Sequence, residues 1–599
     1  MTPKLNSADY GPIPLVFGVT GHSDLISEDI PELEATVRQV FQAVQSRYPH
    51  SPLRLLSPLA EGADRLAATV ALELGGELLV PLPMPHQEYE QDFATSESRQ
   101  EFERLLGEAS QVFELSALPE ATPPRIPKPH SVRERQYEEV GIYVVRHSHF
   151  LLALWDGEDS GLSGGTSSIV QFRIAGLPAE RLNPLDVPDA GLLFHIPARR
   201  QQNAPYKGDY SQFCAQARER AKTKLDGTWE GGAGQYAICC PKAVSLDGFH
   251  RIISRMDEFN REATEITLRG EGPYSDAVVS AFNRSDARVL ETYQNADYLA
   301  IRSRAIYRRA LIAIYCTGAA TGLSYGVLGL PGLGVASPAL AYAIFFLATV
   351  AVFQVQKKAG WFDRYLEYRA LAEGLRVQRF WQIGGLGRGE DGVEAFDLYL
   401  RKQIGEIGWI RESLRALSCY ERVSSKEPAR QFIYEHWVKD QAAYFSAAAE
   451  RDRLRLRRFR WITIPLYGVG LIAALTIRGL TFASSIILTT HRAFGLALRL
   501  LLLAPGLGGL VSNYSSHLAL DEQEKSYRRM AQLFCLGKQK IESSGAQPDM
   551  VFFEAIIRAL GSEALRENAD WLHLHSTHPV QSPNVPRVSL PWRRKPKPE

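Results

Sequence analysis

The sequence predicts two fold classes in one chain: an α/β domain with a Rossmann-like, doubly wound parallel sheet at the N-terminus, and an all-α membrane region after it. Over about the first 200 residues, short apolar runs alternate with helical patterns, which is typical of parallel α/β sheets. From Ala310 to Gln356 the chain then has no Asp, Glu, Lys or Arg. A charge-free stretch of that length is more typical of membrane helices than of a soluble core.

Five apolar runs have the length of buried strands. They lie at Leu15–Val19, Leu53–Leu56, Glu77–Val80, Phe150–Trp155 and Gly191–Ile196. Apolar residues recur at helical spacing between these runs, at 33–44, 63–74, 132–147 and from 166 onward, and this alternation predicts crossover helices. Residues 200–245 show no clear pattern, whereas helical periodicity extends from Leu246 almost to the end of the chain.

These changes of pattern predict five parts. We expect a ligand-binding α/β domain at 1–205, a connector that becomes helical at 206–300, two membrane modules with cytoplasmic helices at 301–450 and 451–578, and a disordered, basic, Pro-rich tail at 579–599. The net charge of +1 argues against direct nucleic-acid binding. The six cysteines form no metal-binding or redox pattern, so no metal site is predicted.

The charge-free stretch holds two apolar runs, at about 310–330 and 337–356, which a short Pro- and Gly-containing break separates. Each run has about the 20 residues that an α-helix needs to cross ~30 Å of hydrocarbon. Because the break allows only a tight turn, the two runs predict a transmembrane hairpin. Basic residues flank it at Arg309 and Lys357 and place both ends in the cytoplasm. The alternative is a hairpin buried in a large soluble protein.

A second, weaker pair of apolar runs lies at about 461–477 and 493–511, after a collar of arginines between Arg451 and Arg460. Arg499 falls inside the second run, where a charge is costly unless it snorkels or faces a helix or water. This pair is alternatively only partly inserted, or lies at the interface. The charged helices that follow the two pairs resemble each other, and a further helix is predicted after each of them, at 393–417 and at 550–574. This likeness predicts a tandem repeat or reflects a chance likeness of post-membrane helices.

Three loops follow predicted strands at the sheet edge where open parallel sheets bind ligands. Their candidate ligand-binding residues are Gly18, Thr20, Gly21 and His22 in the first loop, Glu61, Gly62, Asp64 and Arg65 in the second, and Asp156, Gly164, Gly165 and Thr166 in the third. Glycines let backbone N–H groups approach a phosphate, and a helix N-terminus favours an anion. Together the loops predict a nucleotide-like ligand. Alternatively, Asp64 and Arg65 are surface residues and Asp156 caps its turn.

Three runs carry a resemblance to a known family. Gly-Val-Thr-Gly-His at 18–22, Leu-Ala-Glu-Gly-Ala-Asp-Arg-Leu-Ala-Ala at 59–68 and Gly-Gly-Thr at 164–166 resemble the SLOG superfamily, whose relatives include the DNA-uptake protein DprA and the Lonely guy enzymes. The resemblance covers about the first 200 residues and implies a Rossmann-like fold that binds nucleotides or their derivatives. The enzymatic Lonely guy members carry a glutamate three residues after the threonine, where this chain has Ile169. The resemblance therefore favours a sensor that has no catalytic residues.

The paired-helix membrane modules resemble SLATT domains, which occur with SLOG domains in bacterial conflict systems. The supporting runs are 434–441 with Tyr444, and 565–575, although ordinary helix packing also explains their aromatic faces. This family implies a membrane effector that forms pores when a sensor domain detects its ligand.

These resemblances together imply a function and a location. We expect a homo-oligomeric, pore-forming antiviral defence effector in the bacterial inner membrane. It would be multi-pass with N- and C-terminal regions cytoplasmic, a nucleotide-derived signal as its ligand, and no certain cofactor. The alternatives are a membrane-anchored nucleotide-processing enzyme, such as a phosphoribohydrolase or nucleotide hydrolase, and a non-sensing transporter or structural membrane protein.

Overall fold

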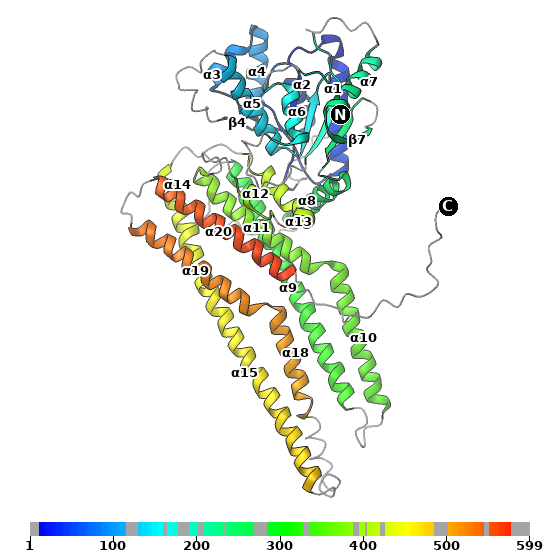
Figure 1. Cartoon of the computed structure of the whole chain (residues 1–599), viewed down its shortest axis with the longest axis vertical. Coiled ribbons are helices and arrows are strands. Elements are labelled where there is room, and N and C mark those ends of the chain that lie inside the picture. The colour runs from blue at the N-terminus through cyan, green and yellow to red at the C-terminus, as the bar shows by residue number, and fades with distance from the viewer. Residues whose placement is uncertain are drawn as a thin grey trace, which may run out of the picture. The chain divides into compact units, whose positions relative to one another are not determined.

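The computed structural model describes residues 11–115, 130–159, 164–177, 191–201, 209–231, 235–242, 244–268, 284–327, 335–386, 394–401, 404–419, 426–483, 501–543 and 550–576. An eight-stranded mixed sheet with its helices comes first in the chain, and the rest of the described chain is helical (Figure 1). The chain forms two compact units. Unit 1 comprises Met1–Leu299, Glu367–Glu435 and Gln547–Arg566, and unit 2 comprises Ala300–Leu366, His436–Ala546 and Glu567–Glu599.

The sheet belongs to unit 1. Its strands are β1 (Leu15–Gly21), β2 (Leu53–Leu56), β3 (Glu77–Leu82), β4 (Gln111–Glu114), β5 (Phe150–Leu154), β6 (Leu192–Ile196), β7 (Gly227–Gly231) and β8 (Ala237–Pro241). They lie in the order β4-β3-β2-β1-β5-β6-β8-β7. The strands from β4 to β6 in this order are parallel, and all five predicted strands are confirmed among them.

The prediction of an entirely parallel sheet was wrong at one edge. β8 pairs antiparallel with β6 and with β7, in the region where the sequence shows no clear pattern. β7 is half-buried or exposed along its length, so it lacks the apolar run by which a buried strand is recognised. The connection between β7 and β8 is far shorter than a parallel crossover requires, and it therefore forces an antiparallel pair.

Helices cover both faces of the sheet. Those that follow β1 to β8 in the chain are α1 (Ile30–Arg47), α2 (Ala63–Glu73), α3 (His86–Tyr89), α4 (Ser96–Glu108), α5 (His130–His147), α6 (Thr166–Ala175), α7 (Tyr210–Lys224) and α8 (Leu246–Leu268). Phe17 of β1 packs against Phe41 of α1, with 4.9 Å between ring centroids. A Cβ on Gly18 would lie 2.5 Å from Val144 Cγ1 of α5. Because successive strand residues face opposite sides, α1 and α5 lie on opposite faces, as the doubly wound prediction requires.

The helical part of unit 1 lies at the amino ends of the strands. Asn260 of α8 bonds Ile13 through both its side-chain oxygen and nitrogen, at 3.0 and 2.7 Å, and Arg54 of β2 donates to the Ala416 carbonyl at 3.1 Å. The other helices here are α11 (Trp361–Ile383), α12 (Ala395–Leu398), α13 (Ile404–Ala416), α14 (Lys426–Ile433) and part of α20 (Met550–Ser576). These contacts leave the carboxyl ends of the strands open.

Two predicted helices of this region have different outcomes. The helix predicted at 550–574 is confirmed as α20. The helix predicted at 393–417 is two helices, α12 and α13. The chain breaks between them at Leu400, whose φ of +54° lies outside the right-handed helical region.

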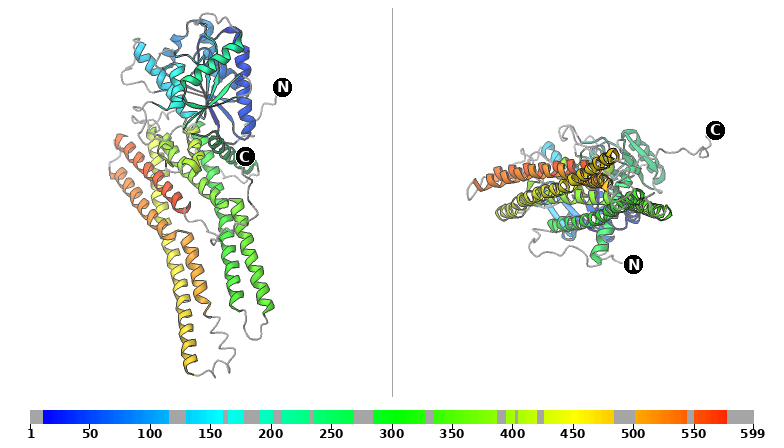
Figure 2. Two further views of the ribbon diagram at one scale, coloured as in Figure 1. Left: turned by 45° about the vertical axis from the view of Figure 1, so that its right-hand side comes forward. Right: turned by 90° about the horizontal axis from the view of Figure 1, so that it is seen from below.

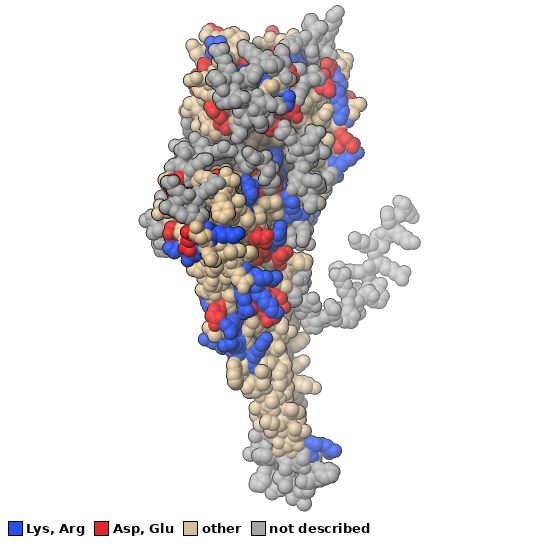
Figure 3. All heavy atoms as spheres, turned by 60° about the vertical axis from the view of Figure 1, so that its left-hand side comes forward, with Lys and Arg blue, Asp and Glu red and all other residues tan. Residues whose placement is uncertain are grey.

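Unit 2 is helical. It contains most of α9 (Arg284–Gly326) together with α10 (Ala336–Ala359), α15 (Asp440–Ala483), α18 (Ala504–His517) and α19 (Leu520–Ser543). Two helical stretches, Ala336–Ile383 and Glu427–Arg478, are long and apolar enough to cross a membrane. Only 6% and 11% of their most apolar windows are buried, so neither packs like a soluble core helix. Figure 3 shows a stretch of surface without Lys, Arg, Asp or Glu below the charged part of this unit, with a further basic group near its lower end.

The predicted membrane runs have separate outcomes. The runs 337–356 and 461–477 fall inside the two candidate spans. Residues 310–326 continue the long helix α9, and 504–511 form part of α18; among the described residues, neither of these helices is a candidate span. Residues 328–330, 493–500 and the tail at 579–599 lie outside the described residues.

Candidate functional site

A cavity of 240 Å³ opens at the carboxyl ends of the parallel strands of unit 1. It lies beside β1, which pairs with β2 on one side and with β5 on the other. After β1 the chain adds β2, β3 and β4 on the first side, and it then returns to the second side to add β5 and β6. Open α/β sheets bind ligands at such a switch point. Residues of all three predicted loops line the cavity. These are Thr20, Gly21 and His22 of the first, Asp64 of the second, and Gly164, Gly165 and Thr166 of the third.

The first loop is held by main-chain bonds and by a buried histidine. The His22 N–H donates to the Leu154 carbonyl at 3.2 Å, and the His22 carbonyl accepts from the Ala63 N–H at 3.1 Å. His22 Nε2 lies 3.1 Å from the backbone nitrogen of Asp156 and 3.2 Å from its Oδ1, and it can accept from the former or donate to the latter. The loop thereby joins the ends of β1 and β5 with the start of α2.

Asp156 stabilises the turn after β5. Its Oδ1 accepts the Glu158 N–H at 2.9 Å, and its carbonyl accepts from Arg220 at 2.8 Å. Burial opposes the charged form of this carboxyl group, but the hydrogen bond and charge of His22, the Glu158 N–H and the charge of Arg200 together outweigh burial and lower the pKa of Asp156. Asp156 is not among the residues that line the cavity, so the structure places it beneath the site.

The second loop adopts an unusual backbone conformation. Leu59 has a φ of +59° and Gly62 a φ of +74°. A Cβ on Gly62 would lie 2.4 Å from the carbonyl oxygen of His22. The Ser57 hydroxyl oxygen accepts the Leu59 N–H at 3.1 Å, and Arg65 Nε donates to the Leu59 carbonyl at 3.1 Å. Left-handed backbone of this kind persists only where surrounding contacts hold it.

Asp64 is the acidic residue that this loop places at the cavity. It stands in the first turn of α2 and its side chain is 5% exposed. Burial raises the pKa of Asp64 to about 7, although the Ala60 N–H and the Ser57 hydroxyl donate to its carboxyl group. Asp64 can therefore change its charge near neutral pH, which an ordinary surface aspartate does not do.

The third loop leads into α6, whose N-terminus faces the cavity. Gly165 is the N-cap of α6, and Gly164, with a φ of +77°, packs so closely on α5 that a Cβ would lie 2.7 Å from the Glu138 nitrogen. Thr166 and Ser167 supply hydroxyl groups to the same wall. The N–H groups of a helix N-terminus and the helix dipole make this wall suitable for an anion. Residues 161–163 of the loop lie outside the described residues.

The remaining predicted residues do not line the cavity. Gly18 lies within β1 against α5, and Gly62 shapes its loop. The Ser98 hydroxyl donates to Glu61. Arg65 donates to Ser98 and stacks over Phe93, with its Cζ 4.4 Å from the ring centroid. These residues position the loops, so their contribution to binding would be indirect.

Several cavity residues were missed by sequence reasoning. Tyr89 of α3 and Tyr137 of α5 are aromatic walls, and Arg200 adds a cation. Arg200 follows the predicted strand at 191–196, so examining every strand end would have found it. Tyr89 and Tyr137 stand on helices, and no local pattern distinguishes them from packing residues.

Ile169 also lines the cavity, and its side chain is 3% exposed. This is the position at which the resemblance places the glutamate of the enzymatic relatives. Its Cδ1 lies 2.1 Å from where a Cβ of Gly141 would be, so α5 and α6 are in close contact here. The structure therefore presents an apolar group at that point of the wall.

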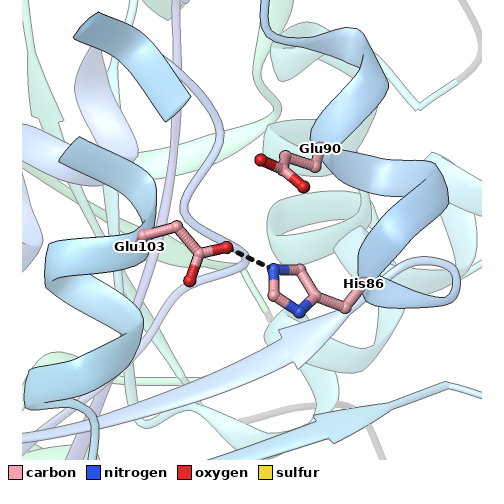
Figure 4. A group of neighbouring side chains, drawn as sticks. All are labelled: His86, Glu90 and Glu103. Carbon is pink, nitrogen blue, oxygen red and sulfur yellow. Dashed lines mark hydrogen bonds and ion pairs between the residues drawn. The ribbon is translucent and has the colours of Figure 1, made fainter. Parts of the chain in front are cut away.

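Three potential metal ligands gather outside the cavity. His86, Glu90 and Glu103 each place one ligand atom within 4.8 Å of the others (Figure 4). His86 Nε2 lies 2.7 Å from Glu103 Oε1, and Glu103 is exposed. An ordinary surface pair of His86 with Glu103 accounts for two of the three residues, and we assign no metal to the group.

Comparison of the chain with protein-family models, with curated proteins and with solved structures gave no match. The fold and the cavity therefore define the class: a doubly wound α/β unit with a switch-point cavity, in a chain that also carries two candidate membrane spans.

Proposed function

We propose that this chain is a SLOG–SLATT-type membrane effector, in which the α/β cavity senses a nucleotide-derived ligand and the membrane helices form or gate a pore. The observation that carries the proposal is that three loops, far apart in sequence, meet in one switch-point cavity. The α6 N-terminus supplies the attraction for a phosphate, and Arg200, whose Nε also pairs with Asp24 at 3.0 Å, adds a positive charge. The apolar Ile169 at the wall favours sensing over hydrolysis.

The membrane region of the proposal consists of two helical hairpins. The Thr349 hydroxyl of α10 donates to the Thr317 hydroxyl of α9 at 2.8 Å, and the two helices lie side by side in both views of Figure 2. A Cβ on Gly470 of α15 would lie 2.1 Å from Pro505 of α18, the close approach that small residues permit between membrane helices. Two hairpins enclose little space, so the proposed pore needs several copies of the chain.

Helix α5 is the proposed link between the cavity and the helices of unit 1. Its residues Tyr137 and Val144 line the cavity. At its C-terminal end, Arg146 donates to Asp397 at 2.5 Å, and His147 Nε2 lies 3.0 Å from Glu394 Oε1. Glu394 and Asp397 form the capping box of α12. A shift of α5 on ligand binding would therefore act directly on α12.

From α12 the link continues to α11. The Tyr399 hydroxyl, just after α12, donates to the Ala370 carbonyl of α11 at 2.9 Å. Helix α11 follows α10 in the chain with only Gly360 between them. A ligand drives such a change only if it binds the active state more tightly than the resting state.

The function is tested by dye leakage from liposomes that hold the purified full chain. Cyclic nucleotides, oligonucleotides and ADP-ribose derivatives are added one at a time. We expect at least one of them to cause leakage, and we expect no leakage when no nucleotide is added. Leakage with none of them, together with turnover of a nucleotide, would contradict the proposal and favour a membrane-anchored enzyme.

Removing the charge that joins α5 to α12 should uncouple sensing from leakage. The variant Asp397→Asn keeps an oxygen for the Glu394 N–H but loses the ion pair with Arg146. We expect ligand-induced leakage to fall about fivefold or more, within the usual range of coupling free energies, while ligand binding measured by calorimetry stays within about twofold. The matched control is Glu108→Gln, which breaks an exposed pair with Arg104 on α4. Equal leakage by both variants would contradict the proposed link from α5 to α12.

Two exposed cysteines report the proposed topology. Cys316 of α9 and Cys535 of α19 are exposed, whereas the other four cysteines are buried. We expect a membrane-impermeant maleimide to label Cys535 in inside-out vesicles and not in right-side-out vesicles. Cys316 should stay unlabelled in both because it faces lipid. Cys535→Ser is the control, and labelling of Cys535 from the outside would contradict the cytoplasmic assignment.

A further inference from the structure

Asp64 reaches the cavity from a different side of the sheet than Arg200 and the α6 N-terminus do. It follows β2, and Tyr89 follows β3, whereas the α6 N-terminus follows β5 and Arg200 follows β6. Beyond β2 the wall therefore carries the buried Asp64 with Tyr89. Beyond β5 it carries the α6 N-terminus and Arg200, together with Glu158, whose carboxyl group pairs with Arg220 at 3.4 Å. A ligand with a phosphate at one end and hydrogen-bond donors at the other matches this arrangement.

We propose that Asp64 binds the uncharged end of the ligand by accepting hydrogen bonds from ribose hydroxyl or base amino groups, while the α6 N-terminus holds the phosphate. This inference rests on the proposed function, because it assumes that the cavity is a nucleotide site. The inference goes further by assigning each end of the ligand to one side of the sheet.

The position of Asp64 supports an acceptor role. Ser57 and Ala60 donate to its carboxyl group. An ionised carboxyl group has about four acceptor sites, so capacity remains for donors that arrive through the cavity. A phosphate would be repelled here once Asp64 is charged, which directs the anionic end to the α6 side.

Binding through Asp64 should release a proton. In the free protein burial raises the pKa of Asp64 to about 7, so much of it is neutral at pH 6. Donors from the ligand favour the charged carboxylate and lower this pKa again. Affinity should therefore be full above about pH 7 and fall as the pH drops below it, by up to about tenfold for each pH unit.

Other titratable and charged groups face the same cavity. They are His22 after β1, Tyr89 of α3, Tyr137 of α5, Glu158 after β5 and Arg200 after β6, and Arg65 lies next to Asp64 on α2. A pH dependence of binding therefore does not by itself identify the group that titrates, and the Asp64 variant is needed to assign it.

The test is calorimetric titration of the full chain in detergent micelles with inorganic phosphate, ribose 5-phosphate and AMP, between pH 5.5 and 8.5. For Asp64→Asn we expect binding of AMP to weaken about 10- to 100-fold at pH 8, since a hydrogen bond to a charged group is lost. Its pH dependence should disappear, and phosphate binding should not change. A loss already seen with ribose 5-phosphate assigns the donors to the ribose, and a loss with AMP alone assigns them to the base.

Three outcomes overturn the inference. If Asp64→Asn binds AMP as the unaltered protein does, or keeps its pH dependence, Asp64 has no such role although the nucleotide site stands. If no probe binds the unaltered protein, the nucleotide site and this inference both fail. If Asp64→Asn does not fold, the unaltered protein is titrated with AMP at pH 7 in buffers of different ionisation enthalpy, which measures proton release on binding. The absence of proton release then overturns the inference.

Discussion

Replacing Gly62 with alanine is expected to abolish ligand binding by the α/β unit, lowering affinity for nucleotide probes such as AMP more than about 100-fold. The new Cβ would lie 2.4 Å from the His22 carbonyl oxygen and 2.6 Å from that of Ser23, and the residue would keep a φ of +74°. Strained backbone alone costs about 1–3 kcal/mol, and here the clash also displaces the loop that carries Thr20 and His22. Titration calorimetry measures the binding, and thermal unfolding measures the stability.

Gly75→Ala is the matched control for this variant. Gly75 follows the other end of α2 with a φ of +78°, but a Cβ there meets nothing within 4 Å. It should lower stability by about 1 kcal/mol through its backbone conformation and leave probe binding unchanged. If Gly62→Ala binds as well as Gly75→Ala, the loops after β1 and β2 do not form the site.

Replacing Leu347 with arginine is expected to remove the chain from the membrane or to invert part of its topology. Leu347 lies near the middle of the apolar run of α10 and is 64% exposed. An arginine at the centre of a membrane helix costs about 2.5–3.5 kcal/mol on insertion scales, which corresponds to roughly a 100-fold change in the ratio of inserted to uninserted chains. The carbonate-resistant membrane fraction measures the effect.

The same substitution at Leu536 is the control, because this leucine is 49% exposed on α19, outside the candidate spans. Leu536→Arg should leave the membrane fraction as it is. Equal behaviour of the two variants would mean that α10 is an ordinary surface helix, and the proposed effector function would then lose its membrane part.

Much of the α/β unit could be predicted because its signals are local. Each of the five predicted strands is an apolar run, and buried parallel strands need such runs. Helices α1, α2, α5 and α6 show apolar residues at helical spacing. β7 and β4 lack a continuous buried run, being partly or wholly exposed at the sheet edges, and the sequence alone did not show them.

The candidate site was predicted in part for the same reason. Gly164, Gly165 and Thr166 follow a strand and begin a helix, and this order is visible in the sequence. Tyr89 and Tyr137 reach the cavity from helices that the fold places beside it. Arg65 looked like a ligand-binding residue, but its guanidinium instead binds the Leu59 carbonyl and Ser98, a contact set only by the packing of α2 against α4.

By itself, the sequence determined the alternation of strands and helices, the three loops at strand ends and the charge-free runs, because hydrophobic periodicity and glycine placement act over a few residues. Only the tertiary structure decided that these loops share one cavity, that Asp64 is buried at its wall, and that α5 joins the cavity to α12. Those facts depend on contacts between residues far apart in the chain, such as Arg146 with Asp397, which the packing of the whole unit fixes.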